Sequence, residues 1–205
     1  MAFTGKQVKQ FRELFSGLNR AYGLYELGNP KFNETEKQSG RAKTVHEPLP
    51  KELWREHLTG KTGLGIVPIR DDNTVTWCAI DIDTYPVDHR EIAKKLEDDN
   101  IQGNVFRSKS GGAHVFFFLE ENIPAKIAQD VLRRVASSIG YGKTEIFPKQ
   151  TELVAERGDV GNWINLPYFN EAETERYLVH PERGPIIFNE AVDYLQSRIV
   201  SVEIF

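Results

Sequence analysis

Apolar residues recur along this chain with two spacings, which predict an alternation of helices and strands. Intervals of three and four residues predict amphipathic helices over 5–18, 50–58, 88–99, 124–139 and 190–198. Strand-like runs bounded by turn residues occupy 21–27, 64–69, 75–83, 104–108, 114–120, 145–147, 163–166 and 176–179. The order of these elements predicts a mixed α+β fold.

Turn residues and spacing add detail to this outline. The sequence Arg70-Asp-Asp-Asn73 predicts a hairpin between 64–69 and 75–83, and Lys109-Ser-Gly-Gly-Ala113 predicts a second between 104–108 and 114–120. We expect Asn189 to cap the last helix. The inner stripe of helix 124–139 is predicted to be Ile127, Val131, Val135 and Ile139.

Two segments depart from this regular pattern. Residues 29–47 contain few apolar side chains, so they are predicted to form a long, mobile loop. Residues 199–205 read as a strand rather than a polar tail, so we expect the chain to be a fragment of a longer protein.

Composition narrows the class of protein. A length of 205 residues with 40% hydrophobic content suits a single domain, which we expect to be monomeric. The one cysteine, Cys78, excludes a disulfide framework, a zinc ribbon or an iron–sulfur cluster built from this chain's thiols. The N-terminus lacks a signal-peptide core and no window is apolar enough to span a membrane, so we expect a soluble, cytoplasmic protein.

The formal net charge of −4 by itself disfavours a nucleic-acid surface. Cations nevertheless gather locally, at 107–109, 133–134 and 143–149. Such clusters are more often ordinary solvated surface, so charge alone does not decide the class.

Two carboxylates stand at the end of the strand predicted over 75–83. The strand period of two places Asp81 and Asp83 on one face, with Trp77 and Ala79. Carboxylates crowded in this way repel each other unless a cation lies between them, and paired divalent ions serve phosphoryl and nucleotidyl transfer. A bare Asp-x-Asp is more often a structural pair or a polar strand end.

The turn Arg107-Ser-Lys-Ser-Gly-Gly-Ala-His114 combines hydroxyls, cations and glycines. Glycines allow backbone N–H groups to approach an anion, so the turn could hold a triphosphate. His114 is expected to share a strand face with Phe116 and Phe118. A histidine beside phenylalanines is, taken alone, more often a core or edge residue.

A third polar group lies in Glu145-Ile-Phe-Pro-Lys-Gln150, where alternation points Glu145 and Lys149 the same way. Pro148 indicates a strand end or edge. Taken alone, the two residues read equally well as a surface ion pair.

These elements, in this order, resemble the archaeo-eukaryotic primase superfamily. Its core carries an Asp-x-Asp or Asp-x-Glu strand, then a Ser/Gly turn ending in histidine, then a third acidic residue on a strand. The chain is most similar to primase-polymerases of mobile elements and defence systems, some of them CRISPR-associated, through residues 11–17, 107–118, 145–150 and 161–167.

The resemblance implies an RNA-recognition-motif-like sheet over 60–205, a smaller N-terminal αβ module over 1–59, and a nucleotide cleft between them. It implies a template-directed nucleotidyl transfer from (d)NTPs to a primer 3′-hydroxyl. Two Mg²⁺ or Mn²⁺ ions would be held by Asp81, Asp83 and Glu145. The implied nucleotide-binding residues are Ser108, Lys109, Ser110, Gly111, Gly112, His114 and Lys149, with Asn162, Asn165 and Arg157 as weaker candidates.

Two departures from the family pattern limit this expectation. A serine often stands two residues before the histidine, whereas this chain has Gly112, so that role would pass to Ser108, Ser110 or backbone amides. Several relatives use cysteine-based zinc segments in initiation, and this chain has none. We therefore expect primer extension, with de novo priming left open.

Other classes remain open at this point. A two-metal nuclease or a sugar-nucleotide transferase would also use paired acids. A non-catalytic RNA-recognition-like binding module would instead present exposed aromatic residues to stacked bases.

Overall fold

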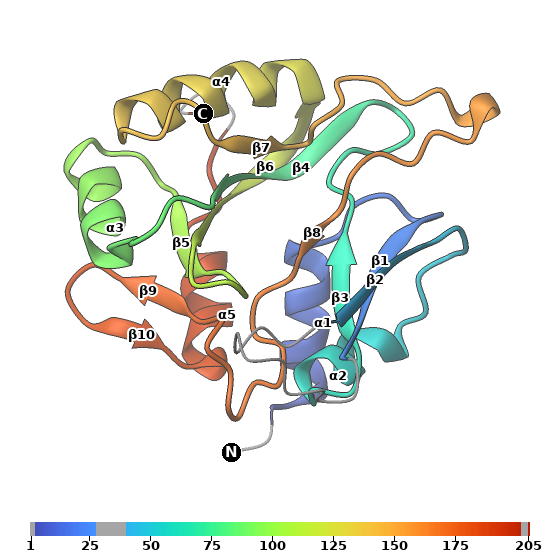
Figure 1. The fold of residues 1–205 in the computed structure, drawn as a ribbon, viewed down its shortest axis with the longest axis horizontal. Helices are drawn as coiled ribbons and strands as arrows, with labels where there is room; N and C mark the ends of the chain where they lie inside the picture. Colours follow the sequence, from blue (N-terminus) through green and yellow to red (C-terminus); the bar gives the residue numbers. More distant parts are fainter. Residues whose placement is uncertain (1–2, 28–39, 202–204) are drawn as a thin grey trace.

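The strands of the computed structural model, which describes residues 3–27, 40–201 and 205, form two antiparallel sheets (Figure 1). The four-stranded sheet has the order β2-β1-β3-β8, with bounds Gly40–Val45, Tyr22–Leu27, Gly63–Ile66 and Ile164–Asn165. The six-stranded sheet has the order β10-β9-β5-β6-β4-β7, with bounds Gly184–Ile186, Leu178–His180, Asn104–Arg107, Ala113–Pro124, Thr74–Ile82 and Glu145–Phe147. The mixed α+β fold is confirmed.

The larger sheet contains an RNA-recognition-motif-like unit. Along the chain the elements run β4, α3 (His89–Asp98), β5, β6, α4 (Ala125–Ser138) and β7. In space the four strands lie in the order β5-β6-β4-β7, so this is the split β-α-β-β-α-β arrangement. Helix α2 (Glu52–Leu58) packs against β3 of the smaller sheet, helix α1 (Gly5–Leu14) contacts α2 and α5, and α5 (Phe188–Gln196) follows β10.

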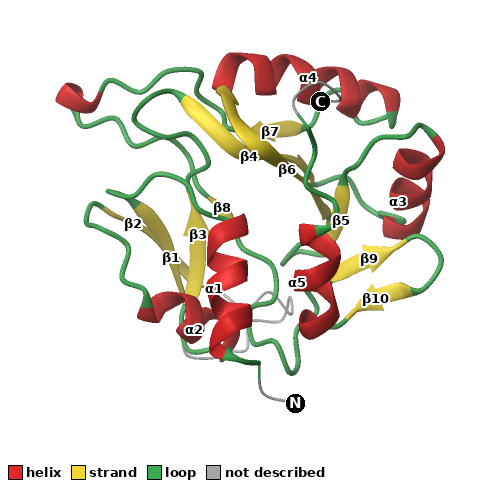
Figure 2. Cartoon of the chain, turned by 180° about the vertical axis from the view of Figure 1, so that it is seen from behind, coloured by secondary structure: helices red, strands yellow, loops and turns green. Residues whose placement is uncertain are grey.

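Strand β4 separates two buried clusters by its alternation. Cys78, Ile80 and Ile82 pack with residues of α3 and α4, whereas Trp77 and Ala79 pack with α1, α5 and the smaller sheet. Figure 2 shows α1 between the two sheets and α4 on the outer side of β4 and β6. One face of the larger sheet is therefore covered by helices, and the other faces the N-terminal part of the chain.

Helix α1 begins and ends for local reasons. Thr4 and Gln7 form a capping box, in which the Thr4 hydroxyl accepts from Gln7 N at 3.2 Å and Gln7 Oε1 accepts from Thr4 N at 2.8 Å. The helix stops at Leu14, earlier than predicted, because Leu18 N instead donates to the backbone of Val67 at 2.9 Å.

The prediction of a hairpin between 64–69 and 75–83 is wrong. A tight turn does form, with Asn73 N donating to Arg70 O at 3.0 Å. However, both edges of β3 are occupied by β1 and β8, so β3 joins the smaller sheet while β4 joins the larger one. Because β3 and β8 both follow residue 59, the sheet division does not coincide with a division of the chain at that point. The hairpin of β5 and β6 is confirmed.

The predicted inner stripe of α4 is also partly wrong. Ile127 is 51% exposed, whereas the small residues Ala125 and Ala128 are fully buried against the sheet. Because an α-helix has 3.6 residues per turn, a strict spacing of four drifts around the helix and carries Ile127 away from Ile139.

Other differences concern element ends. The loop predicted over 29–47 contains strand β2, which pairs with β1, while residues 28–39 lie outside the described residues. Helix α5 starts at Phe188 after Ile187, so Asn189 lies inside the helix rather than capping it. Strand β10 was not predicted. In the C-terminal segment Val200 bridges Leu119 in parallel, and 202–204 lie outside the described residues.

Candidate active site

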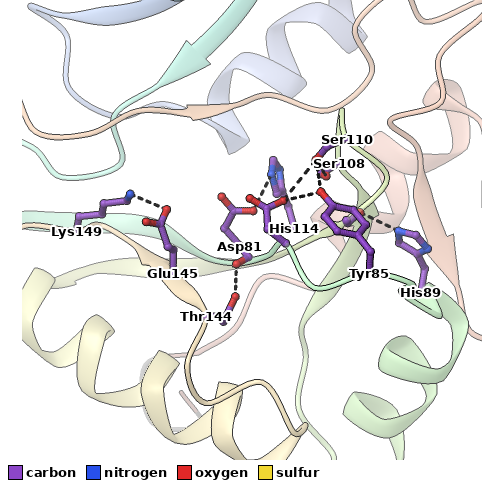
Figure 3. Close-up of polar contacts among 11 residues, drawn as sticks. Asp81, Tyr85, His89, Ser108, Ser110, His114, Thr144, Glu145 and Lys149 are labelled. Carbon is purple, nitrogen blue, oxygen red and sulfur yellow. Dashed lines mark hydrogen bonds and ion pairs between the residues drawn. The ribbon is translucent and has the colours of Figure 1, made fainter. Parts of the chain in front are cut away.

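The polar residues singled out by the sequence form a row across the larger sheet. Glu145 of β7 lies opposite Asp81 of β4, Asp81 lies opposite His114 of β6, and His114 lies opposite Phe106 of β5. Directly opposed residues of antiparallel strands share a face, with Cβ atoms about 5 Å apart. The structure thus brings together three residues that are far apart in the sequence (Figure 3).

Asp81 and His114 are the most buried polar residues of this row. Their side chains are 16% and 10% exposed, and His114 Nε2 lies 3.3 Å from Asp81 Oδ1. The two atoms do not form a hydrogen bond, so the buried Asp81 Oδ1 has no hydrogen-bond partner. An unsatisfied carboxylate oxygen in a buried position is costly unless a proton donor or a cation reaches it.

Asp83 lies one step further along the strand direction, in contact with the turn between β5 and β6. The Tyr85 hydroxyl is 3.0 Å from Asp83 Oδ1 and 2.7 Å from Ser110 Oγ. Ser110 Oγ is also 3.4 Å from Asp83 and 3.2 Å from the hydroxyl of the buried Ser108. The hydroxyls of the turn therefore lie beside the second carboxylate.

The hydrogen bond with Ser110 is the largest influence on the Tyr85 phenol and favours its ionised form. Burial and the negative charges of Asp83 and Asp81 together outweigh it, so the pKa of Tyr85 is raised. Tyr85 therefore remains a hydrogen-bond donor at neutral pH.

Close packing explains why residue 112 is glycine. A Cβ at Gly112 would lie 2.3 Å from the backbone oxygen of Ile82, so no side chain fits there. The neighbouring Gly111 has a φ of 89°, which other residues rarely adopt. The serine that relatives often carry at this position is excluded by the approach of β4, and Ser110 supplies a hydroxyl beside Asp83 instead.

Two further residues hold the backbone of the site. His89, at the start of α3, contacts the carbonyl oxygen of Gly112 through Nε2 at 2.9 Å. The Thr144 hydroxyl donates to the carbonyl oxygen of Asp81. Neither residue, nor Tyr85, was singled out from the sequence. The only signal for Tyr85 was its place two residues after Asp83, and His89 and Thr144 gave none.

Glu145 and Lys149 occupy the exposed end of the row. Their side chains are 63% and 32% exposed and form an ion pair at 2.6 Å. Lys149 is thus engaged by the carboxylate that was predicted to bind metal, rather than lying free for phosphate.

The oxygen atoms of Asp81, Asp83 and Glu145 are of the type that binds divalent cations, but the three carboxylates do not lie close together in this structure. Carboxylate oxygens are the ligands that Mg²⁺ and Mn²⁺ prefer, and the unpartnered Asp81 Oδ1 is available to one. Among the residues that the structure describes, no three His, Cys, Asp or Glu side chains lie close enough to hold an ion. Completing the set would require Glu145 to leave Lys149.

The remaining predicted residues lie at varying distances from this row. Lys109 leaves the turn toward the smaller sheet, where its ammonium is 3.2 Å from the centre of the Tyr25 ring. Asn165 belongs to β8 in the smaller sheet, and Asn162 hydrogen-bonds with Gln150. Arg157 is exposed in the short 3₁₀ turn Ala155–Arg157, on a loop that projects from the body of the molecule (Figure 1).

A comparison against known families identifies the family of the chain. A profile described as "TOTE conflict system, Archaeo-Eukaryotic Primase domain" matches residues 6–201, nearly the whole chain. The chain belongs to the archaeo-eukaryotic primase family. At the level of this family it is a primase-polymerase-like nucleotidyltransferase domain of the kind associated with defence systems.

Comparisons with individual proteins give less. No curated protein matches the chain. Among solved structures it is similar to the "Cyanophage S-2L Primase-Polymerase (PrimPol), AEP domain (PP-N190)", with a TM-score of 0.44 and 13% identity over 82% of this chain and 93% of that chain. In the described part of this archaeo-eukaryotic primase domain, no helix has the length and apolar character needed to cross a bilayer.

Proposed function

We propose that this domain is a template-directed primase-polymerase, which transfers nucleotides from (d)NTPs to the 3′-hydroxyl of a primer. The observation that carries the proposal is the register of Glu145, Asp81 and His114, which places two acids and a histidine side by side on one sheet face. Its partners would be a primer-template nucleic acid and nucleoside triphosphates.

The acids of the row would hold the divalent ions. Asp81 offers a buried oxygen without a partner, Asp83 lies at the strand end, and Glu145 can join them when it leaves Lys149. Two Mg²⁺ or Mn²⁺ ions bound there would activate the primer 3′-hydroxyl and stabilise the charge on the leaving pyrophosphate.

The turn from Ser108 to His114 would bind the triphosphate. The Ser110 hydroxyl lies beside Asp83, and His114 stands next to Asp81. Phosphates held by this turn would therefore be adjacent to the carboxylates, as in-line transfer requires. Tyr85 and His89 would keep the turn in place, since they contact Ser110 and Gly112.

A base-stacking surface on this sheet face receives no support. Phe106, Phe116 and Phe118 are all 2% exposed or less, packed against α1 and neighbouring aromatics. A non-catalytic RNA-recognition-like module would need such rings at the surface.

A primer-extension assay tests the function. Labelled dNTPs and NTPs would be supplied with Mg²⁺ and Mn²⁺ separately, with and without primer. Replacing Asp81→Asn and Asp83→Asn together should lower the extension rate by about three powers of ten or more, because bound ions supply several kcal/mol of transition-state stabilisation.

The matched control replaces two exposed acids at the end of α3, Asp98→Asn and Asp99→Asn, with the same change in charge and no loss of extension expected. Substantial extension by the folded Asp81/Asp83 variant would show that these acids are not catalytic. Degradation of the strand without any need for triphosphate would instead identify a nuclease.

A further inference from the structure

Arg176 is a buried cation whose charge no carboxylate balances within the described part of the chain. The residue is only 9% exposed, and its Nη1 is buried without a hydrogen-bond partner. Its guanidinium group lies against the ring of Phe169, whose centre is 5.0 Å from the guanidinium carbon. Burial lowers the pKa of Arg176 to about 10, which reflects the cost of holding this charge away from water.

The position of Arg176 follows from strand pairing. Phe106 of β5 lies opposite Leu178 of β9, and Arg107 N donates to Tyr177 O at 3.1 Å, so the pairing continues toward the turn. Arg176 and Ser108 come next on the two chains. Because residues two apart in a strand share a face, both point to the same side as Phe106 and His114.

Arg176 therefore extends a second row across the same face. One row runs through Glu145, Asp81, His114 and Phe106 to Leu178. The other runs from Asp83 to Gly112 and Ser108, which are joined by the bond from Ser108 N to Gly112 O at 2.8 Å, and on to Arg176. Opposed residues of antiparallel chains have Cβ atoms about 5 Å apart, so the side chains of Arg176 and Ser108 begin close together on this face.

Lys109 brings a second cation to this region. It lies over the Tyr25 ring, and the same Tyr25 acts electrostatically on Arg176. Neither cation forms an ion pair with a described carboxylate. Arg107, which lies in the neighbouring strand β5, differs because it is paired with Glu175 at 2.8 Å, and Lys149 at the far edge of the sheet is paired with Glu145 at 2.6 Å.

We propose that Arg176 binds the outer phosphates of the incoming nucleoside triphosphate, with Lys109 beside it. A buried guanidinium without a protein partner is destabilising by itself, but it can form two parallel hydrogen bonds to a phosphate. This inference rests on the proposed function, because it takes the turn of Ser108–His114 as the place where the phosphate chain lies.

Binding measurements without catalysis test the inference. Isothermal titration of the intact domain with a non-hydrolysable dNTP, a dNDP, a dNMP and inorganic tripolyphosphate would compare the wild type with Arg176→Met and Arg176→Lys. Arg176→Met should weaken the binding of the triphosphate and of tripolyphosphate by about ten- to a hundredfold and leave dNMP affinity nearly unchanged. The affinity of Arg176→Lys should lie between those of the wild type and Arg176→Met, because lysine keeps the charge but cannot donate two parallel hydrogen bonds to a phosphate.

Arg198→Met is the matched control. Like Arg176, Arg198 lies over an aromatic ring, with its guanidinium carbon 5.4 Å from the centre of Tyr194, but it is half-buried and contacts Gly103 at the opposite end of β5. This variant should bind every ligand as the wild type does. Melting curves of all variants accompany the titrations, and Arg176→Met should melt at or above the wild-type temperature because an unbalanced buried charge has been removed.

The possible results separate this inference from the proposed function. An Arg176→Met protein that melts earlier and binds triphosphate normally would show that Arg176 is structural, with the proposed function untouched. If that variant does not fold, wild-type triphosphate affinity in Arg176→Lys would overturn the inference. A wild type that binds neither triphosphate nor tripolyphosphate would overturn both proposals, and tight triphosphate binding without strand extension would overturn the proposed function alone.

Discussion

Two buried histidines occupy the two halves of this molecule, and their surroundings differ in one respect. His57 of α2 is fully buried behind the smaller sheet, where Nε2 lies 2.8 Å from Pro167 O and Nδ1 accepts from Leu64 N at 3.0 Å. His114 of β6 is 8% exposed as a whole residue, and its neighbour Asp81 has an oxygen without a hydrogen-bond partner. Both ring nitrogens of His57 have hydrogen-bond partners within the protein, whereas the carboxylate beside His114 has an oxygen that lacks one.

This difference separates a structural residue from a functional candidate better than burial does. Both rings also contact phenylalanines, at 6.4 Å between centres for His57 and Phe11 and 5.7 Å for His114 and Phe116. Aromatic surroundings therefore do not distinguish them. A buried polar group without a full set of hydrogen-bond partners lowers the stability of the folded state. A bound ligand can offset this cost by supplying the missing partner.

Of the two histidine replacements, His57→Ala should cause the larger loss in the free energy of unfolding. It leaves the Leu64 N–H and the Pro167 carbonyl without partners and opens a cavity, so the free energy of unfolding should fall by about 3–5 kcal/mol. Urea unfolding measures this loss. Extension activity per folded molecule should remain. His46→Ala, at the exposed residue directly after β2, is the control with no expected loss of stability. Normal stability of the His57 variant would contradict the structural assignment.

His114→Ala should show the opposite pattern. Loss of a donor to a charged phosphate oxygen corresponds to about 1.5–3 kcal/mol, which lowers triphosphate affinity by one to two powers of ten. The free energy of unfolding should fall less than in the His57 variant. Calorimetric titration of a non-hydrolysable triphosphate, together with a melting curve, measures both. Unchanged affinity in a destabilised protein would make His114 a second structural histidine.

The burial of His57 should also make the stability of the protein depend on pH. Burial lowers the pKa of His57 to about 3, and the nearby charge of Arg176 acts in the same direction. The unfolded chain takes up this proton near pH 6.5 and the folded chain does not, so stability present above pH 6.5 is lost as the pH falls toward 3. Between pH 7 and pH 5 the wild type should lose about 2 kcal/mol from this residue. Urea titrations at both pH values should show a smaller loss for His57→Asn, and an equal loss in the two proteins would contradict it.

Local patterns were sufficient for much of the fold and for the strand face on which Asp81 lies. The alternation in residues 75–83 placed Asp81 on the face of Trp77 and Ala79, which the two separate clusters confirm. The glycines of the turn at 109–113 predicted the hairpin of β5 and β6. Both succeed because period and turn chemistry act over a few neighbouring residues.

Pairing between distant segments was decided only by the tertiary structure. The sequence could not show that β3 leaves β4 for β1 and β8, since a strand edge accepts any partner of suitable register. For the same reason the sequence pattern predicts only the start of an ordinary strand at Arg176, which lies 68 residues after Ser108 in the chain. By itself the sequence determined which residues share a face within each element. Only the packing of the two sheets decided which charges are left without partners, because hydrogen-bond partners and burial come from chain segments that meet on folding.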